Sequence, residues 1–66
     1  MTKKKWIDRF VKQFIRGTDS SFKALAKDAA QVSYLEYGNP ESRNYDKDYS
    51  PENAADDEYF AMCSDA

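Results

Sequence analysis

Residues 5–16 read KWIDRFVKQFIR, and this stretch decides the fold class. Its large apolar residues come in adjacent pairs that recur every four positions: Trp6 and Ile7, Phe10 and Val11, Phe14 and Ile15. At 100° per residue these pairs cover one half of a helix, and polar or charged residues cover the other half. A strand would alternate with a period of two, which this stretch does not do. We therefore predict an amphipathic helix over residues 4–16, ended by Gly17.

A second helix is predicted over residues 19–37. Residues 18–21 are all good helix N-caps, and the Gly-Asn-Pro run at 38–40 favours a stop. Its predicted inner face consists of Phe22, Leu25, Ala26, Ala29, Val32 and Ser33. Because the link between the two helices is short, residues 1–37 are expected to form an antiparallel amphipathic hairpin, with the aromatic half of the first helix on the alanine-rich face of the second.

The rest of the chain is predicted to be an acidic loop over residues 38–50 and a short acidic helix over 51–63. Ser50 suits the N-cap of that helix and Pro51 its first position. Its apolar stripe is thin, with Ala55, Tyr59 and Met62 only, so we expect it to need the hairpin for stability. The sequence thus predicts an all-α protein, a single small helical domain over 1–66, with a tyrosine-rich acidic loop between helices two and three.

The expected core lies mostly in the first half of the chain. It comprises Trp6, Ile7, Phe10, Val11, Phe14, Ile15, Phe22, Leu25, Ala26, Ala29 and Val32, closed by Tyr59 and Met62. A core of this size rarely supplies more than roughly 3–5 kcal/mol, so a partner or a second copy is the expected staple. Cys63 is the only cysteine, which excludes an internal disulfide and favours a reducing, cytoplasmic setting. Charged residues interrupt the apolar run that a signal peptide would need after Lys3–Lys5.

The charges of the chain are strongly polarised, although the net charge is only −2. Residues 1–16 carry six basic residues against one acid, a net charge of +5. Residues 36–66 carry nine acids against two basic residues, a net charge of −7. Such polarity is an argument about partners rather than about the fold.

The preferred functional surface is the acidic, tyrosine-rich half. Tyrosines give a large contact area at a low entropic cost, and dense carboxylates complement a basic protein surface, including one that binds nucleic acid phosphates. The candidate partner-binding residues are Tyr37, Tyr45, Asp46, Asp48, Tyr49, Asp56, Asp57, Glu58 and Tyr59. The competing interpretation is that the acids only keep a poorly packed tail in solution.

An alternative surface is a basic stripe along the first helix, formed by Lys5, Arg9, Lys12 and Arg16. This spacing could follow a nucleic acid backbone or an anionic membrane surface, and Trp6 and Phe10 on the opposite half suit a membrane interface. The simpler interpretation is a solvated charged face over an ordinary core, with some pairing to the acidic half of the same chain.

Enzymatic chemistry is disfavoured by the residues available. There is no histidine to act as a general base or to complete a zinc site with the single cysteine, and two glycines cannot build a glycine-rich phosphate loop. Asp46, Asp48 and Ser50 have calcium-loop spacing, but Pro51 occupies the position that needs glycine. We expect no catalytic residues, no metal and no cofactor.

The size and the charge blocks resemble those of small proteins with which phages and other mobile elements disable host factors, although no motif carries this resemblance. The leading hypothesis is a small non-enzymatic inhibitor or regulator whose acidic surface, a candidate mimic of DNA, docks on a basic protein surface. The alternatives are a membrane-surface or nucleic-acid binder that uses the basic stripe, and a structural subunit of a larger assembly or homo-oligomer.

Overall fold

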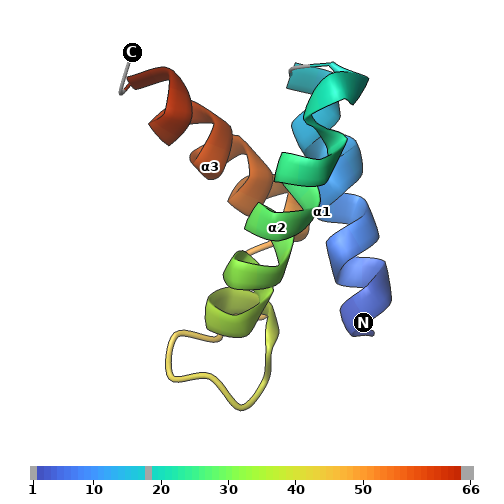
Figure 1. The fold of residues 1–66 in the computed structure, drawn as a ribbon. Helices are drawn as coiled ribbons and strands as arrows, with labels where there is room; N and C mark the ends of the chain where they lie inside the picture. The colour runs from blue at the N-terminus through green and yellow to red at the C-terminus, as the bar shows by residue number, and fades with distance from the viewer. Residues whose placement is uncertain (1, 18, 65–66) are drawn as a thin grey trace.

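The computed structural model describes residues 2–17 and 19–64, and it consists of three α-helices and their connections (Figure 1). The helices are α1 (Lys3–Gly17), α2 (Lys23–Ser33) and α3 (Pro51–Ser64). A 3₁₀ turn, η1 (Ser20–Phe22), leads into α2, and a single π-helical turn, η2 (Tyr34–Gly38), continues it. No strand is present within these described ranges. The predicted all-α class, with a helical hairpin and a third helix, is therefore confirmed.

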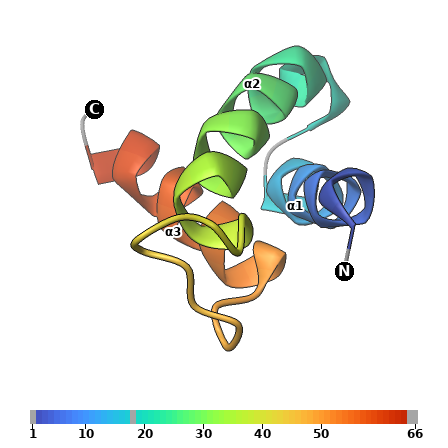
Figure 2. The ribbon, with the colours of Figure 1, turned by 90° about the horizontal axis from the view of Figure 1, so that it is seen from below.

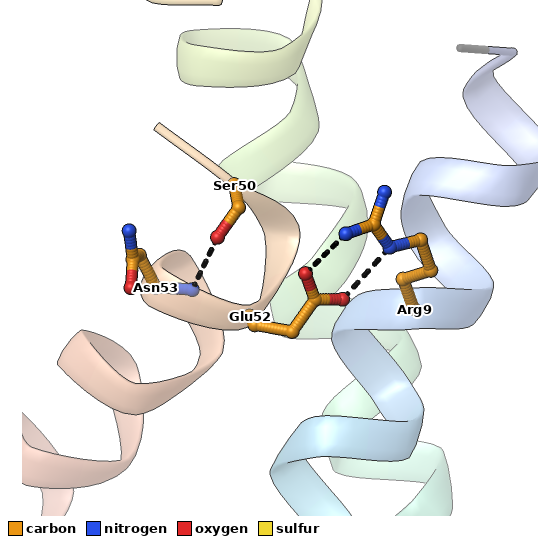
Figure 3. Close-up of polar contacts among 4 residues, drawn as sticks. All are labelled: Arg9, Ser50, Glu52 and Asn53. Atoms are coloured by element: carbon orange, nitrogen blue, oxygen red, sulfur yellow. Dashed lines mark hydrogen bonds and ion pairs between the residues drawn. The ribbon is translucent and has the colours of Figure 1, made fainter. Parts of the chain in front are cut away.

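The ends of the elements follow from local hydrogen bonds. The side chain of Asp19 accepts a hydrogen bond from the backbone N–H of Ser21 at 2.6 Å and so caps η1. The hydroxyl of Ser50 accepts from the backbone N–H of Asn53 at 3.1 Å at the start of α3 (Figure 3). The N–H of Asn39 donates to the Tyr34 carbonyl at 2.8 Å, which closes the π turn. With η1 and η2 counted into the second helix, each predicted helix boundary lies within one residue of the observed one.

The three helices do not contribute equally to the packing. α1 and α2 run antiparallel, and α3 runs back in the same general direction as α1 (Figure 1). α1 makes its most extensive contact with α3 and the next with α2, whereas α2 and α3 touch only slightly. Seen from below, α1 lies to one side of both, with the loop under α2 and α3 (Figure 2). The third helix is therefore the main neighbour of α1 and not an accessory to a two-helix hairpin.

The core is a row of aromatic rings from α1 covered by alanines. Trp6 stacks on Phe10 with ring centroids 5.8 Å apart, and Phe10 on Phe14 at 6.1 Å. The buried core cluster comprises Trp6, Phe10, Val11 and Phe14 of α1, Ala26 and Ala30 of α2, and Ala54 and Ala55 of α3, and Pro51 at the start of α3 is also fully buried. Small side chains on α2 and α3 allow both helices to approach the rings of α1 closely.

The predicted inner face of α2 is confirmed for Ala26 and Ser33, which are buried, and for Ala29, which packs against the core, but it was wrong for its large side chains. Phe22, Leu25 and Val32 are 41, 43 and 65% exposed, while Ala30, absent from the predicted core, is fully buried. The predicted and observed faces differ by roughly 60–70° at 100° per residue. The physical reason is that the rings of α1 already fill the interior, so α2 packs through its smallest side chains. Met62, the predicted closure on α3, is also 38% exposed.

Candidate binding surface

Aromatic and acidic side chains from three separate segments meet beside the loop. Tyr37 of η2 and Tyr49 of the loop form an edge-to-face pair with centroids 5.1 Å apart. The hydroxyl of Tyr49 donates a hydrogen bond to Oδ2 of Asp57 on α3 at 2.5 Å. Together with Glu36 and Glu58, whose charges act on these phenols, they form what we call the tyrosine–acid cluster.

Burial and the neighbouring carboxylates raise the pKa of both phenols of the tyrosine–acid cluster. Burial, followed by the hydrogen bond to Asp57 and its charge, raises the pKa of Tyr49 well above its ordinary value of about 10. The negative charge of Glu36 is the largest cause that raises the pKa of Tyr37, followed by a hydrogen bond with the same residue. Both phenols are neutral at pH 7, as ordinary tyrosines are, and they lie beside exposed carboxylates.

The loop that carries Tyr45 and Tyr49 is held by its own short polar side chains. Oδ1 of Asp46 accepts from the N–H of Asp48 at 2.9 Å, and the hydroxyl of Ser42 donates to the Glu36 carbonyl at 2.6 Å. Such side-chain turns are the usual way in which Asp and Ser order irregular backbone. The loop is thereby tied back to the π turn.

A pocket of about 270 Å³ lies next to the tyrosine–acid cluster. Its wall is formed by four aromatic side chains, two charged ones, two prolines and a glycine, namely Trp6, Tyr37, Tyr45, Tyr49, Asp46, Lys47, Pro40, Pro51 and Gly38. We call it the aromatic pocket. A Cβ on Gly38 would lie only 2.8 Å from Cε2 of the Trp6 indole, so glycine is needed for the close approach of backbone and ring. Sequence reasoning placed Trp6 in the core or, in the alternative, at a membrane interface, and gave no indication of this pocket.

The predicted partner-binding residues are not all on one surface. Tyr37, Tyr49, Asp57 and Glu58 belong to the tyrosine–acid cluster, and Tyr45 and Asp46 line the aromatic pocket. Asp48 is exposed on the loop. Asp56 instead accepts a hydrogen bond from the Gln13 side chain at 3.0 Å. Tyr59 packs edge-to-face on Phe14 of α1, with centroids 6.3 Å apart.

The basic stripe is interrupted by an ion pair between α1 and α3. Arg9 donates to both carboxylate oxygens of Glu52, from Nε at 2.9 Å and from Nη2 at 2.5 Å (Figure 3). This hydrogen bonding raises the pKa of Arg9 further. The pair and the Gln13–Asp56 bond have the same sequence separation of 43 residues, so they form two successive rungs between the helices. The only sequence signal for this contact was that Arg9 and Gln13 on α1 have the same four-residue spacing as Glu52 and Asp56 on α3.

Three lysines, one of them from the basic stripe, line a second concave surface. A groove of about 420 Å³ between α1 and α2 has Ile7, Val11 and Ile15 along one side. The basic residues that line it are Lys12, Lys23 and Lys27, and Asp8 and Gln31 complete the lining. Of the four residues in the basic stripe, only Lys12 lines this groove.

A metal-binding group and a membrane-spanning helix are both absent from residues 2–17 and 19–64. These residues contain no group of three or more Cys, Asp or Glu side chains placed to hold a metal ion. None of the helices in the described part combines the length and the apolar character needed to cross a membrane. Comparison of the chain with protein-family models, with curated proteins and with solved structures found no match.

Proposed function

We propose that this chain is a small non-enzymatic binding protein, an inhibitor or regulator, that docks its acidic, tyrosine-rich surface on a basic surface of a protein partner. The observation that carries the proposal is the tyrosine–acid cluster, in which Tyr37, Tyr49 and Asp57 come together from three segments. We further propose a cytoplasmic setting, which the single cysteine favours because it excludes an internal disulfide.

Two physical properties of the cluster support this role. Its tyrosines are held by ring packing and by the bond from Tyr49 to Asp57, so little side-chain freedom remains to be lost on binding. The charges of Glu36 and Glu58 lie close enough to act on the phenols. Carboxylates around an aromatic centre accelerate encounter with a basic surface and favour it over acidic competitors.

The alternative that uses the basic stripe has less support. Its membrane form needs the apolar half of α1 to enter the lipid, but Trp6, Phe10 and Phe14 are buried in the core at 4, 0 and 1% exposure. Its nucleic-acid form needs a continuous row of cations, but Arg9 is paired with Glu52. Within residues 2–17 and 19–64, Lys5, Lys12 and Arg16 of the stripe form no ion pair with an acid.

The test is a pull-down from nuclease-treated lysate with a tagged chain and two matched charge-reversal variants. The first carries Asp57→Lys and Glu58→Lys in the tyrosine–acid cluster. The second, the control variant, carries Asp28→Lys and Glu41→Lys, which make the same change in charge at exposed positions outside the candidate partner-binding residues. Circular dichroism of all three proteins controls for folding.

We expect the parent chain and the control variant to retain the same protein at similar stoichiometry, and the cluster variant to retain at least tenfold less of that protein. Retention that survives reversal of the cluster but disappears with Lys5→Glu and Lys12→Glu would transfer the function to the basic face. Retention that is equal in all the variants would contradict both proposals.

A further inference from the structure

The aromatic pocket has the composition of a site for an organic cation. Four aromatic residues line it, and aromatic rings attract cations through the negative potential of their faces. Asp46 adds a carboxylate to the same wall. Its volume of about 270 Å³ is just below the roughly 300–1,000 Å³ of pockets for drug-sized ligands, so it suits one side chain or a small head group.

The walls of the aromatic pocket are fixed before any ligand arrives. Trp6 is only 4% exposed and is stacked on Phe10, so its ring is held in place by packing. Tyr49 is held by Tyr37 and Asp57, as described above. Tyr45, at 42% exposure, is the most exposed of the four aromatic residues that line the pocket. A rigid aromatic wall with one adjustable ring needs little reorganisation on binding.

The neighbouring aromatic surface already carries one ammonium group from the chain itself. Nζ of Lys3 lies 5.8 Å from the ring centroid of Tyr34, within cation–π range. The Tyr34 ring in turn packs edge-to-face on Trp6, with centroids 5.7 Å apart. The Lys3 ammonium group thus lies against Tyr34, whose ring contacts Trp6 on the wall of the pocket.

We propose that the aromatic pocket binds an alkylammonium group, supplied by a lysine side chain of the partner protein. The identity of this source rests on the proposed function, since the tyrosine–acid cluster beside the pocket would face the same basic surface. Methylation of the lysine strengthens binding, because an ammonium is strongly hydrated and its methylated forms are easier to remove from water. Lys47 on the wall weakens binding by repulsion.

Trp6 is the only tryptophan, so its indole N–H is a single resonance that reports on the aromatic pocket. The probes, titrated at constant ionic strength, are choline, its neutral isostere 3,3-dimethylbutan-1-ol, and N-acetyl-lysine amide with and without three Nε-methyl groups. We expect a saturable shift with choline and trimethyllysine, and binding about twofold to thirtyfold weaker for the neutral isostere. Equal binding of the isostere, or no saturable shift with any cation, would overturn the proposal.

Matched variants assign the effect to the pocket. Asp46→Asn keeps the turn-forming carbonyl but removes the charge, and it should weaken choline binding at least twofold. Asp48→Asn makes the same change two residues away, outside the pocket wall, and should leave binding unchanged. Tyr45→Ala should weaken binding without lowering the melting temperature, since this ring is substantially exposed. Lys47→Gln should tighten choline binding, because it removes a repelling positive charge from the pocket wall. Equal effects of Asp46→Asn and Asp48→Asn would indicate general electrostatic attraction and contradict a pocket.

The source of the alkylammonium group is tested separately. Trimethyllysine amide should compete with the captured partner protein, and the chain should not float with phosphatidylcholine vesicles. Flotation that choline inhibits would reassign the pocket to a lipid head group and overturn the lysine assignment. Because the titration uses small molecules, it can fail while capture still depends on Asp57 and Glu58. The proposed function can likewise fail while the pocket still binds choline.

Discussion

At the scale of single residues, Gly38 shows how a position can be decided by space and not by backbone angle. No glycine among the described residues has a positive φ, so the turn itself does not require one. A Cβ at this position would instead lie 2.7 Å from Cδ1 of Tyr34 and 2.9 Å from Nε1 of Trp6. Sequence alone gave only a helix stop at this position, because contact with a ring from a distant segment leaves no local pattern.

The two glycines of the chain provide a matched pair of alanine substitutions. Gly38→Ala should lower the free energy of unfolding by about 1–3 kcal/mol, as overpacking does, and should shift the Trp6 indole resonance. Gly17→Ala should stabilise the chain by up to about 1 kcal/mol through helix propensity, since its Cβ would make an ordinary 3.7 Å contact with the Tyr59 ring. Urea denaturation measures both values. A Gly38→Ala variant as stable as the parent would show that Trp6 can move aside.

At the scale of elements, α2 marks the limit of what periodicity can predict. Its existence and ends follow from caps, stops and alanine content, and the structure confirms them. Its rotation does not follow, because small apolar residues surround much of the helix and either face could pack. The choice was made by α1, whose stacked rings leave room for Ala26 and Ala30 but not for Leu25 and Val32. The rotation of α2 therefore depends on the space left by the other helices, which the sequence of α2 alone does not contain.

Two substitutions on α2 distinguish the observed rotation from the one that periodicity favours. Val32→Ser exchanges residues of similar helix propensity at a position that is 65% exposed, so the free energy of unfolding should change by less than about 0.5 kcal/mol. Ala30→Leu adds volume at a fully buried position and should cost about 1–3 kcal/mol. Thermal and urea unfolding of both variants give the comparison. A costly Val32→Ser with a harmless Ala30→Leu would restore the rotation predicted from sequence.

At the scale of the whole molecule, some of the opposite charges that make the sequence asymmetric pair with one another in the fold. Opposite charges at the two ends suggested two free surfaces, but Arg9 and Glu52 join them across α1 and α3. The loop surface remains acidic because Asp57 and Glu58 lie on the other side of α3 from the contacts with α1 made by Glu52 and Asp56. Sequence thus indicated the chemistry of the candidate surface, while the division of its residues between surface and interior required the packing of α3.

The role of α3 leads to a prediction about the chain as a cooperative unit. Its apolar stripe is too thin to indicate a core helix, yet Ala54 and Ala55 are buried against the core and Tyr59 covers Phe14. A 66-residue chain is expected to have a stability of only roughly 3–10 kcal/mol, at about 0.05–0.15 kcal/mol per residue. Uncovering even one core aromatic ring costs about 1.5–3 kcal/mol of that stability.

A fragment of residues 1–50 should therefore lose its cooperative thermal transition by circular dichroism, while a fragment of residues 1–62 should keep it. A sharp transition of the 1–50 fragment near the parent midpoint would mean that α1 and α2 are sufficient by themselves, and that the extensive contact between α1 and α3 adds little to stability.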